Sequence, residues 1–170
     1  MASRPPVELS IDQRRLAVAA KALASEVDGK TLKRNLHKTL KATAEAPIAA
    51  AKASILATPS QGLTESQPLR AEIARSIKPV SRLSGRTAGV SIRQSQTPNV
   101  RGFKMAGRRF NHGSFRRPVF GKAWVVQAGH PEWFDRPMQD AQPEFKADVL
   151  RVVQDLAHLL AERARASASL

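Results

Sequence analysis

The sequence predicts an α+β fold: a small antiparallel β-sheet packed by a long N-terminal helical region and an amphipathic C-terminal helix, with a long basic loop. Apolar residues recur about every four positions before residue 60 and again after residue 144, which is the period of a helix buried on one face. Between these regions the apolar period changes to two, which indicates strands. The chain has 170 residues, a length that suits one domain.

The N-terminal region is expected to begin as an extended arm and to continue as helix. Residues 1–9 contain Arg4-Pro5-Pro6, and proline favours an extended chain, so we expect an arm over 1–9 and a single α+β domain over 10–170. Pro47 lies within the helical pattern and predicts a kink or a new helix start, because it lacks an N–H donor. The apolar stripe of this region is Leu32, Leu36, Leu40, Ile48, Ala51 and Ile55.

The middle of the chain is predicted to hold a short helix, two strands and a long loop. Residues 67–77 place apolar side chains four apart, and residues 78–84 and 87–94 alternate as two strands joined at Gly85-Arg86. Residues 95–122 show no clear period and contain several glycines and prolines, so we expect a loop inserted between strands. A loop of this length in a small domain is typically functional or ordered by a partner.

The C-terminal part is predicted to anchor the sheet to the last helix. Residues 123–128 are expected to form a strand, and Asp135 before Arg136-Pro137 suits a helix start. From Phe145 onward the apolar positions follow the strongest helical period in the chain. The expected fold anchors, which join the sheet to this helix, are Phe120, Trp124, Val126, Trp133 and Phe134.

The composition excludes several classes of site and segment. The chain has no cysteine, which excludes disulfides, thiolate zinc sites and cysteine nucleophiles. No run of about 18 apolar residues is present, so neither a membrane span nor a membrane partner is expected. The first 15 residues lack the apolar core of a secretion signal.

Positive charge is concentrated in the middle of the chain. The whole chain has 28 Lys and Arg residues against 14 Asp and Glu residues, a net charge of +14. Residues 61–122 hold 13 basic and 2 acidic residues, whereas residues 123–170 hold 5 basic and 7 acidic residues. This distribution predicts a polyanionic partner, either nucleic acid or an acidic protein surface.

Neither catalysis nor a bound cofactor is expected. The four histidines, His37, His112, His130 and His158, lack the spacing of a metal site. The chain has no GxSxG nucleophile motif, and the glycines of residues 102–113 do not fit a phosphate-binding loop. We therefore expect a protein that is not an enzyme and has no catalytic, cofactor-binding or metal-binding residues.

The basic and aromatic loop is the candidate functional segment. Its arginines can pair with phosphates and its phenylalanines can stack on unpaired bases, which suits nucleic acid. Alternatively, the phenylalanines anchor the loop to the sheet or to a neighbouring subunit, and the arginines meet acidic side chains. No RNA-binding motif is present, so the interface interpretation is favoured. Its expected residues are Arg101, Lys104, Arg108, Arg109, Phe110, Phe115, Arg116 and Arg117.

Several segments resemble the tail-completion, or neck, proteins at the head–tail junction of long-tailed bacteriophages, especially the actinobacterial-phage type. In that family an R-x-P-V-F-G segment precedes a W-V-x-Q strand, and a P-x-W-F segment opens the last helix. The corresponding segments are Arg116–Gly121, Trp124–Gln127 and Pro131–Phe134. The segments ATPS, LRAEIARSI and GRTAGVSIR are similar to that family as well.

The resemblance implies a structural virion protein that forms a homo-oligomeric ring at the head–tail junction, in a virion assembled in the host cytoplasm. Such a ring joins the connector or head-closure protein to the tail tube or tail-terminator protein and lets double-stranded DNA pass with transient contact. The alternatives are a tail terminator at the same junction and a free basic nucleic-acid-binding protein. Because an arginine-lined channel would bind the phosphate backbone and slow its passage, we expect most of the basic loop to face partner proteins.

Overall fold

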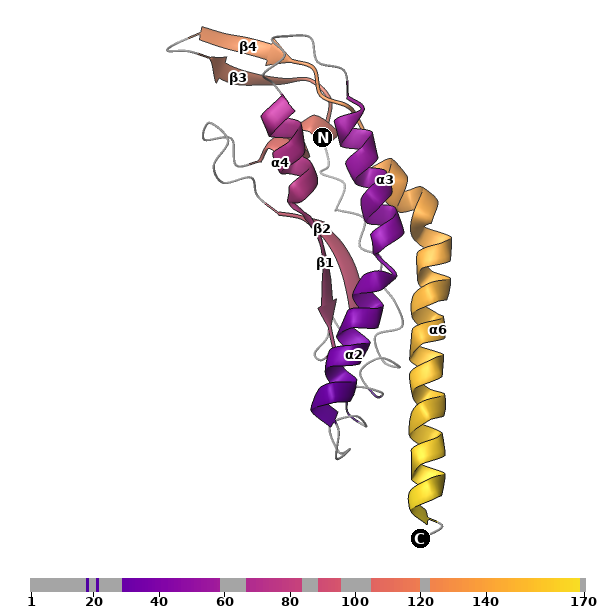
Figure 1. Cartoon of the computed structure of the whole chain (residues 1–170). Helices are drawn as coiled ribbons and strands as arrows, with labels where there is room; N and C mark the ends of the chain where they lie inside the picture. The colour runs from indigo at the N-terminus through magenta and orange to yellow at the C-terminus, as the bar shows by residue number, and fades with distance from the viewer. Residues whose placement is uncertain are drawn as a thin grey trace. The chain divides into compact units, whose positions relative to one another are not determined.

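A computed structural model describes residues 29–58, 67–83, 89–95, 105–119 and 123–168, together with Val18 and Lys21. The helices are α2 (Gly29–Ala42), α3 (Glu45–Leu56), α4 (Gln67–Arg75), α5 (Ala106–Asn111) and α6 (Asp135–Ala168) (Figure 1). The strands are β1 (Ile77–Arg82), β2 (Gly89–Gln94), β3 (Phe115–Val119) and β4 (Ala123–Gln127). This mixture confirms the predicted α+β class, although the described strands form two separate two-stranded sheets, β1–β2 and β3–β4, rather than one.

The chain divides into two compact units, and each is described by itself. Unit 1 comprises Met1–Val7, Ala46–Lys78 and Arg93–Ala141, and unit 2 comprises Glu8–Glu45, Pro79–Ile92 and Gln142–Leu170. The expectation of one domain over residues 10–170 stays a prediction. The predicted arm over residues 1–9 lies outside the described residues.

The helical region around Pro47 consists of two helices rather than one kinked helix. Since α2 ends at Ala42 and α3 starts at Glu45, Pro47 lies in the first turn of α3, where an N–H has no intrahelical partner. The Thr43 hydroxyl donates to the Leu40 carbonyl at 2.9 Å and so satisfies one of the last carbonyl groups of α2. The Glu45 carboxylate at the start of α3 also favours helix formation there, because its negative charge lies at the positive end of the helix dipole.

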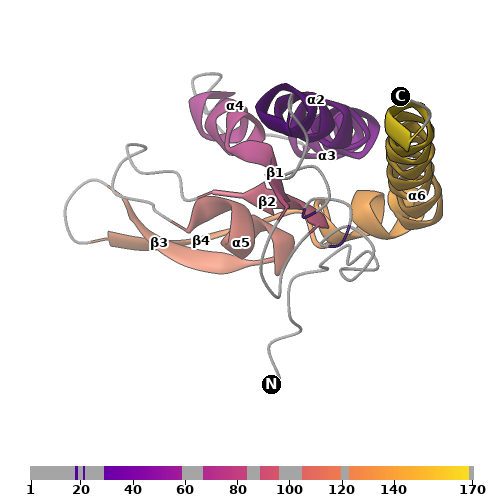
Figure 2. The same ribbon diagram turned by 90° about the horizontal axis from the view of Figure 1, so that it is seen from below.

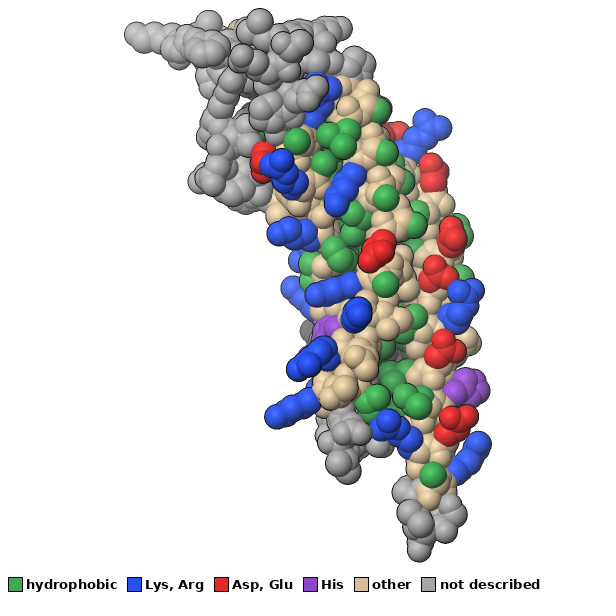
Figure 3. All heavy atoms as spheres, viewed as in Figure 1, with side chains coloured by type: hydrophobic (Ala, Val, Ile, Leu, Met, Phe, Trp, Pro, Cys, Tyr) green, Lys and Arg blue, Asp and Glu red, His purple; other side chains and the backbone are tan. Residues whose placement is uncertain are grey.

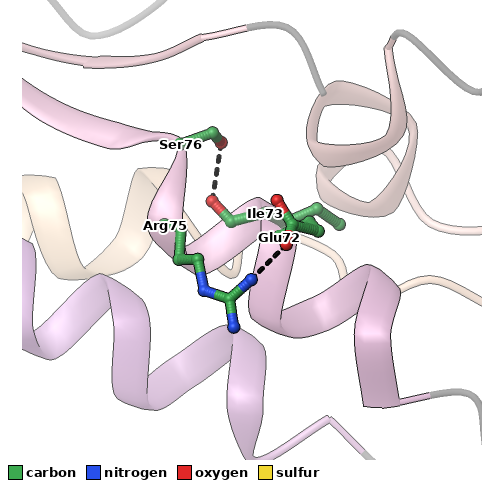
Figure 4. Close-up of polar contacts among 4 residues, drawn as sticks. All are labelled: Glu72, Ile73, Arg75 and Ser76. Carbon is green, nitrogen blue, oxygen red and sulfur yellow. Dashed lines mark hydrogen bonds and ion pairs between the residues drawn. The ribbon is translucent and has the colours of Figure 1, made fainter. Parts of the chain in front are cut away.

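Polar contacts tie the end of α4 to the sheet that follows (Figure 4). The Ser76 hydroxyl donates to the Ile73 carbonyl at 2.6 Å, and Arg75 pairs with Glu72 one turn earlier. The side-chain amide of Gln94, at the end of β2, donates to the Ser76 hydroxyl at 2.9 Å. These bonds satisfy a terminal carbonyl of α4 and fix the point where the chain changes from helix to strand.

The core of unit 1 is formed by apolar side chains from α3, α4, β1, α5 and the beginning of α6. Its buried residues are Ile48, Ala51, Ile55, Ile73, Ala74, Ile77, Ala106, Phe110, Trp133 and Met138. Trp133 is only 1% exposed, and its indole N–H donates to the Gly107 carbonyl at 3.1 Å. The largest core side chain therefore also satisfies its one polar group.

A hydrogen-bonded junction joins α5 to the turn before α6. The Asn111 side chain accepts from the Phe134 N–H at 3.0 Å and donates to the Asp135 carboxylate at 2.8 Å. The Gly129 N–H donates to the Gly113 carbonyl at 3.0 Å. A Cβ at position 129 would lie 2.3 Å from that same carbonyl oxygen, so the junction requires glycine there.

Residues 95–122, which we expected to form a loop, contain α5 and β3. Strand β3 pairs with β4 in antiparallel register, with Arg116 opposite Val126 and Pro118 opposite Trp124. The sequence did not predict this strand because it contains Pro118. Proline is nevertheless tolerated there, since each strand of a two-stranded sheet is an edge strand. Helix α5 has only six residues, which is too short to show a helical period.

Unit 2 combines α2, most of β1 and β2, and the longer part of α6. Figures 1 and 2 show α2 and α6 side by side. The predicted strands over residues 78–84 and 87–94 correspond to β1 and β2, and the expected turn at Gly85-Arg86 lies outside the described residues. The buried apolar residues of unit 2 are Leu36, Leu40, Ala44, Leu83, Val90, Ile92, Phe145, Val149, Val153 and Leu156.

Candidate functional site

One face of α2 is strongly basic. The helix sequence GKTLKRNLHKTLKA contains five Lys and Arg residues and no acidic residue. They stand at positions 30, 33, 34, 38 and 41, a spacing that keeps them on one side of the helix, whereas Leu36 and Leu40 are buried on another side. Figure 3 shows the Lys and Arg side chains gathered along α2. The helix therefore packs through one face and presents cations on another.

A solvent-open groove of about 840 Å³ lies between this basic face and β1. All of its lining residues belong to unit 2, and we call it the α2 groove. Its lining residues are Lys30, Lys33, Arg34, His37 and Lys41 from α2, with Pro79, Val80 and Ser81 from β1.

His37 joins the two walls of the α2 groove. Its Nδ1 and the Ser81 hydroxyl share a hydrogen bond of 2.7 Å. Partial burial and the positive charges of Lys41 and Lys33 lower the pKa of His37 below its ordinary value of 6.5. The imidazole is therefore neutral at pH 7, and the permanent charge of the groove comes from its lysines and its arginine.

The cations of the α2 groove are not neutralised within the described part of the chain. The side chains of Lys30, Lys33, Arg34 and Lys41 have no hydrogen bond or ion pair there, in contrast to Arg151, which pairs with Asp148 at 3.0 Å. Like charges held this close repel one another, and an anion bound among them would remove the repulsion. The arrangement therefore suits a ligand with several negative charges.

A second candidate surface is the exposed face of the β3–β4 sheet. Because Arg116 stands opposite Val126 and Pro118 opposite Trp124, these four positions share one face. Trp124 is 60% exposed and Val126 is 70% exposed, and Arg116 is exposed beside them. We call Arg116, Trp124 and Val126 the hairpin face. It is apolar at its centre and basic at one end.

An acidic stripe runs along α6. Glu144, Asp148, Asp155 and Glu162 follow a 4-7-7 spacing, which places them on one side of the helix. Three of them are exposed and Asp148 is half-buried. Figure 3 shows acidic side chains along α6. The chain therefore carries both a basic and an acidic surface.

The described residues of the predicted interface differ in burial. Arg108 and Arg109 are exposed on α5, Arg116 is exposed on β3, and Phe115 is half-buried. Phe110 does not reach an outer surface: it is only 4% exposed in the core of unit 1, with its ring centroid 5.3 Å from that of Phe115. The remaining predicted positions, Arg101, Lys104 and the side chain of Arg117, lie outside the described residues.

The predicted fold anchors differ in burial as well. Trp133 is buried, and Phe134 is half-buried with its ring edge-on to Trp133 at a centroid distance of 5.5 Å. Trp124 and Val126 do not anchor the described fold, because the face that they share points to solvent. Phe120 lies outside the described residues.

The α2 groove is the surface that sequence reasoning missed. Its signal was present, since α2 has five cations and no acidic residue, but a charged helix face is usually only a solvated surface. The hydrogen bond between His37 and Ser81, which lies 44 positions later, joins the two walls of the groove. A contact over that separation cannot be read from helical periodicity.

The chain matches no protein-family model, no curated protein and no solved structure. Among the residues that the structure describes, no helix is both long enough and apolar enough to cross a membrane. Within the same ranges, no group of three or more His, Asp or Glu residues is placed to hold a metal ion. The chemistry of the three surfaces is therefore the basis for inferring function.

Proposed function

We propose that this chain is a structural virion protein of a tailed bacteriophage, which assembles as a homo-oligomeric ring at the head–tail junction. In this role it joins the connector or head-closure protein to the tail and lets double-stranded DNA pass, without catalysis. Two lines of support meet in one segment. The neck-protein resemblance is strongest over Arg116–Phe134, and the same segment carries the hairpin face.

The observation that carries the proposal is the exposure of Trp124 and Val126 on the hairpin face. Tryptophan and arginine are enriched in protein interfaces and dominate their hot spots. Burying an apolar side chain contributes roughly 1.5–3 kcal/mol compared with leaving it in water. A face of this composition therefore favours a protein partner.

A second copy of the chain is the partner that the charges favour. The hairpin face ends in Arg116, and α6 presents the acidic stripe of Glu144, Asp148, Asp155 and Glu162. Contact between these two different surfaces on successive copies is heterologous, and such a contact generates a ring when the rotation closes. Charge complementarity would set the orientation, while the apolar residues would provide most of the affinity.

The test compares two exposed apolar residues of unit 1 by sedimentation of the purified full chain. Trp124→Ser is expected to convert the ring into free subunits, because it removes the centre of the hairpin face. Leu56→Ser is the matched control, since Leu56 is 54% exposed on α3 and is not part of the hairpin face. If both variants sediment like the wild type, or if both dissociate, the hairpin face is not the assembly surface.

A tail terminator at the same junction would use the same kinds of contact. The order of neighbouring genes tests the class that the two share: either protein is expected between genes for the capsid and connector and a gene for the major tail protein.

A further inference from the structure

We propose that the α2 groove binds the sugar–phosphate backbone of duplex nucleic acid, without reading its sequence. All of the residues that carry this inference lie in unit 2 of a single chain. It therefore does not depend on ring assembly or on the hairpin face, and one proposal can fail without the other.

The size and charge of the groove suit a run of phosphates. Lys30 and Lys41 are eleven positions apart on α2, which is about 16 Å along a helix axis. A duplex carries one negative charge per ~1.7 Å of its axis, so this length presents about nine or ten phosphates. The groove offers four permanent cations to them, and none is paired within the described residues.

The residue types of the groove favour phosphates over an acidic protein. Three of its four permanent cations are lysines, and lysine is depleted in protein–protein interfaces, which use aromatic, methionine and arginine side chains. Among the described residues that line it, Pro79 and Val80 are the apolar ones, and none is Phe or Trp. The hairpin face has the opposite composition. The two surfaces are therefore suited to different partners.

The lysines of the groove also explain why we expect binding that does not depend on the base sequence of the duplex. The ammonium group of lysine is a mobile point charge on a flexible stem, whereas the planar fork of arginine is pre-organised for bidentate recognition. The α2 groove contains one such fork, Arg34. The Ser81 hydroxyl can donate to a phosphate oxygen when His37 accepts no bond from it.

The experiment is a salt titration of the purified full chain with a fluorescent 20-base-pair duplex, read by anisotropy between 50 and 200 mM salt. Each neutralised phosphate contributes a slope of about −0.9 to the plot of log affinity against log salt concentration. The double variant Lys33→Gln/Arg34→Gln is expected to reduce the magnitude of this slope by about 2, equally for duplexes of different sequence. Lys30→Gln/Lys41→Gln is an independent second pair with the same expected loss.

The matched control is Lys52→Gln/Lys146→Gln, which removes the same charge from α3 and α6 and is expected to leave the slope unchanged. Circular dichroism melts check that all of the variants fold. If the α2 pairs and the control pair lose equal affinity, the binding is a property of net charge and the proposal is overturned. Binding of poly-glutamate in preference to the duplex would overturn it as well, and would indicate an acidic protein partner.

Discussion

The two tryptophans of this chain have opposite environments. Trp133 is 1% exposed and donates to the Gly107 carbonyl, whereas Trp124 is 60% exposed on the hairpin face. The sequence predicts that Trp124 and Val126 share one side of a strand, because side chains alternate along it. It does not predict which side meets the core, and both residues were therefore expected in the core rather than at the surface.

Trp133→Ala is expected to destabilise the fold by about 3–5 kcal/mol, as is typical for truncation of a fully buried large side chain. Urea unfolding measures this loss. Trp124→Ala, at a concentration where the chain is dissociated, is expected to change stability by less than about 0.5 kcal/mol, because the side chain is already in water. Equal losses in the two variants would contradict the assignment of one tryptophan to the core and the other to an interface.

His37 is expected to make the stability of unit 2 depend on pH. Its pKa in the folded chain lies below 6.5, first because of partial burial and then because of Lys41 and Lys33, while Ser81 faces it from β1. The unfolded chain therefore takes up the proton first as the pH falls. The stability present above about pH 6.5 is lost as the pH falls through the folded pKa.

A His37→Gln variant is expected to lose this contribution. Its melting temperature should fall less than that of the wild type between pH 7.5 and pH 5.0, as measured by circular dichroism. Each protein gives a slope of melting temperature against pH. Comparing the two slopes cancels the titration of all other groups, because it is common to both proteins. Identical slopes would show that His37 is not desolvated in the folded chain.

At the scale of elements, the long periodic segments were predictable and the short ones were not. Helices α2, α3, α4 and α6 and strands β1, β2 and β4 follow runs of apolar residues long enough to show a period. Helix α5 depends instead on tertiary contacts: the burial of Phe110 and the bond from Trp133 to Gly107. Strand β3 depends on its pairing with β4. Such contacts are not visible in a local pattern.

The junction between α5 and α6 should be sensitive to any side chain at Gly129. In Gly129→Ala the new Cβ would meet the Gly113 and Phe110 carbonyl oxygens at 2.3 and 2.5 Å, which are backbone atoms that cannot move separately. We expect a loss of about 1–3 kcal/mol, the usual cost of overpacking. The neighbouring substitution Ala128→Ser, at an exposed position, is the control. Equal melting temperatures for the two variants would contradict the close approach.

At the scale of the whole molecule, each compact unit carries its own kind of surface. Unit 1 presents the apolar hairpin face, whereas unit 2 presents the α2 groove and the acidic stripe of α6. The sequence predicted a polyanionic or acidic partner from its net charge of +14. From the sequence we placed that contact only in residues 101–117. The α2 groove was not predicted, because it forms only where β1 lies beside α2 in the folded chain.

The mass of the wild-type assembly tests the central claim most directly. Native mass spectrometry of the purified full chain should give one species whose mass is a whole-number multiple, three or more, of the subunit mass, and Trp124→Ser should give the subunit alone. A wild-type chain that keeps the mass of a single subunit at every concentration would contradict the proposal that it forms a ring.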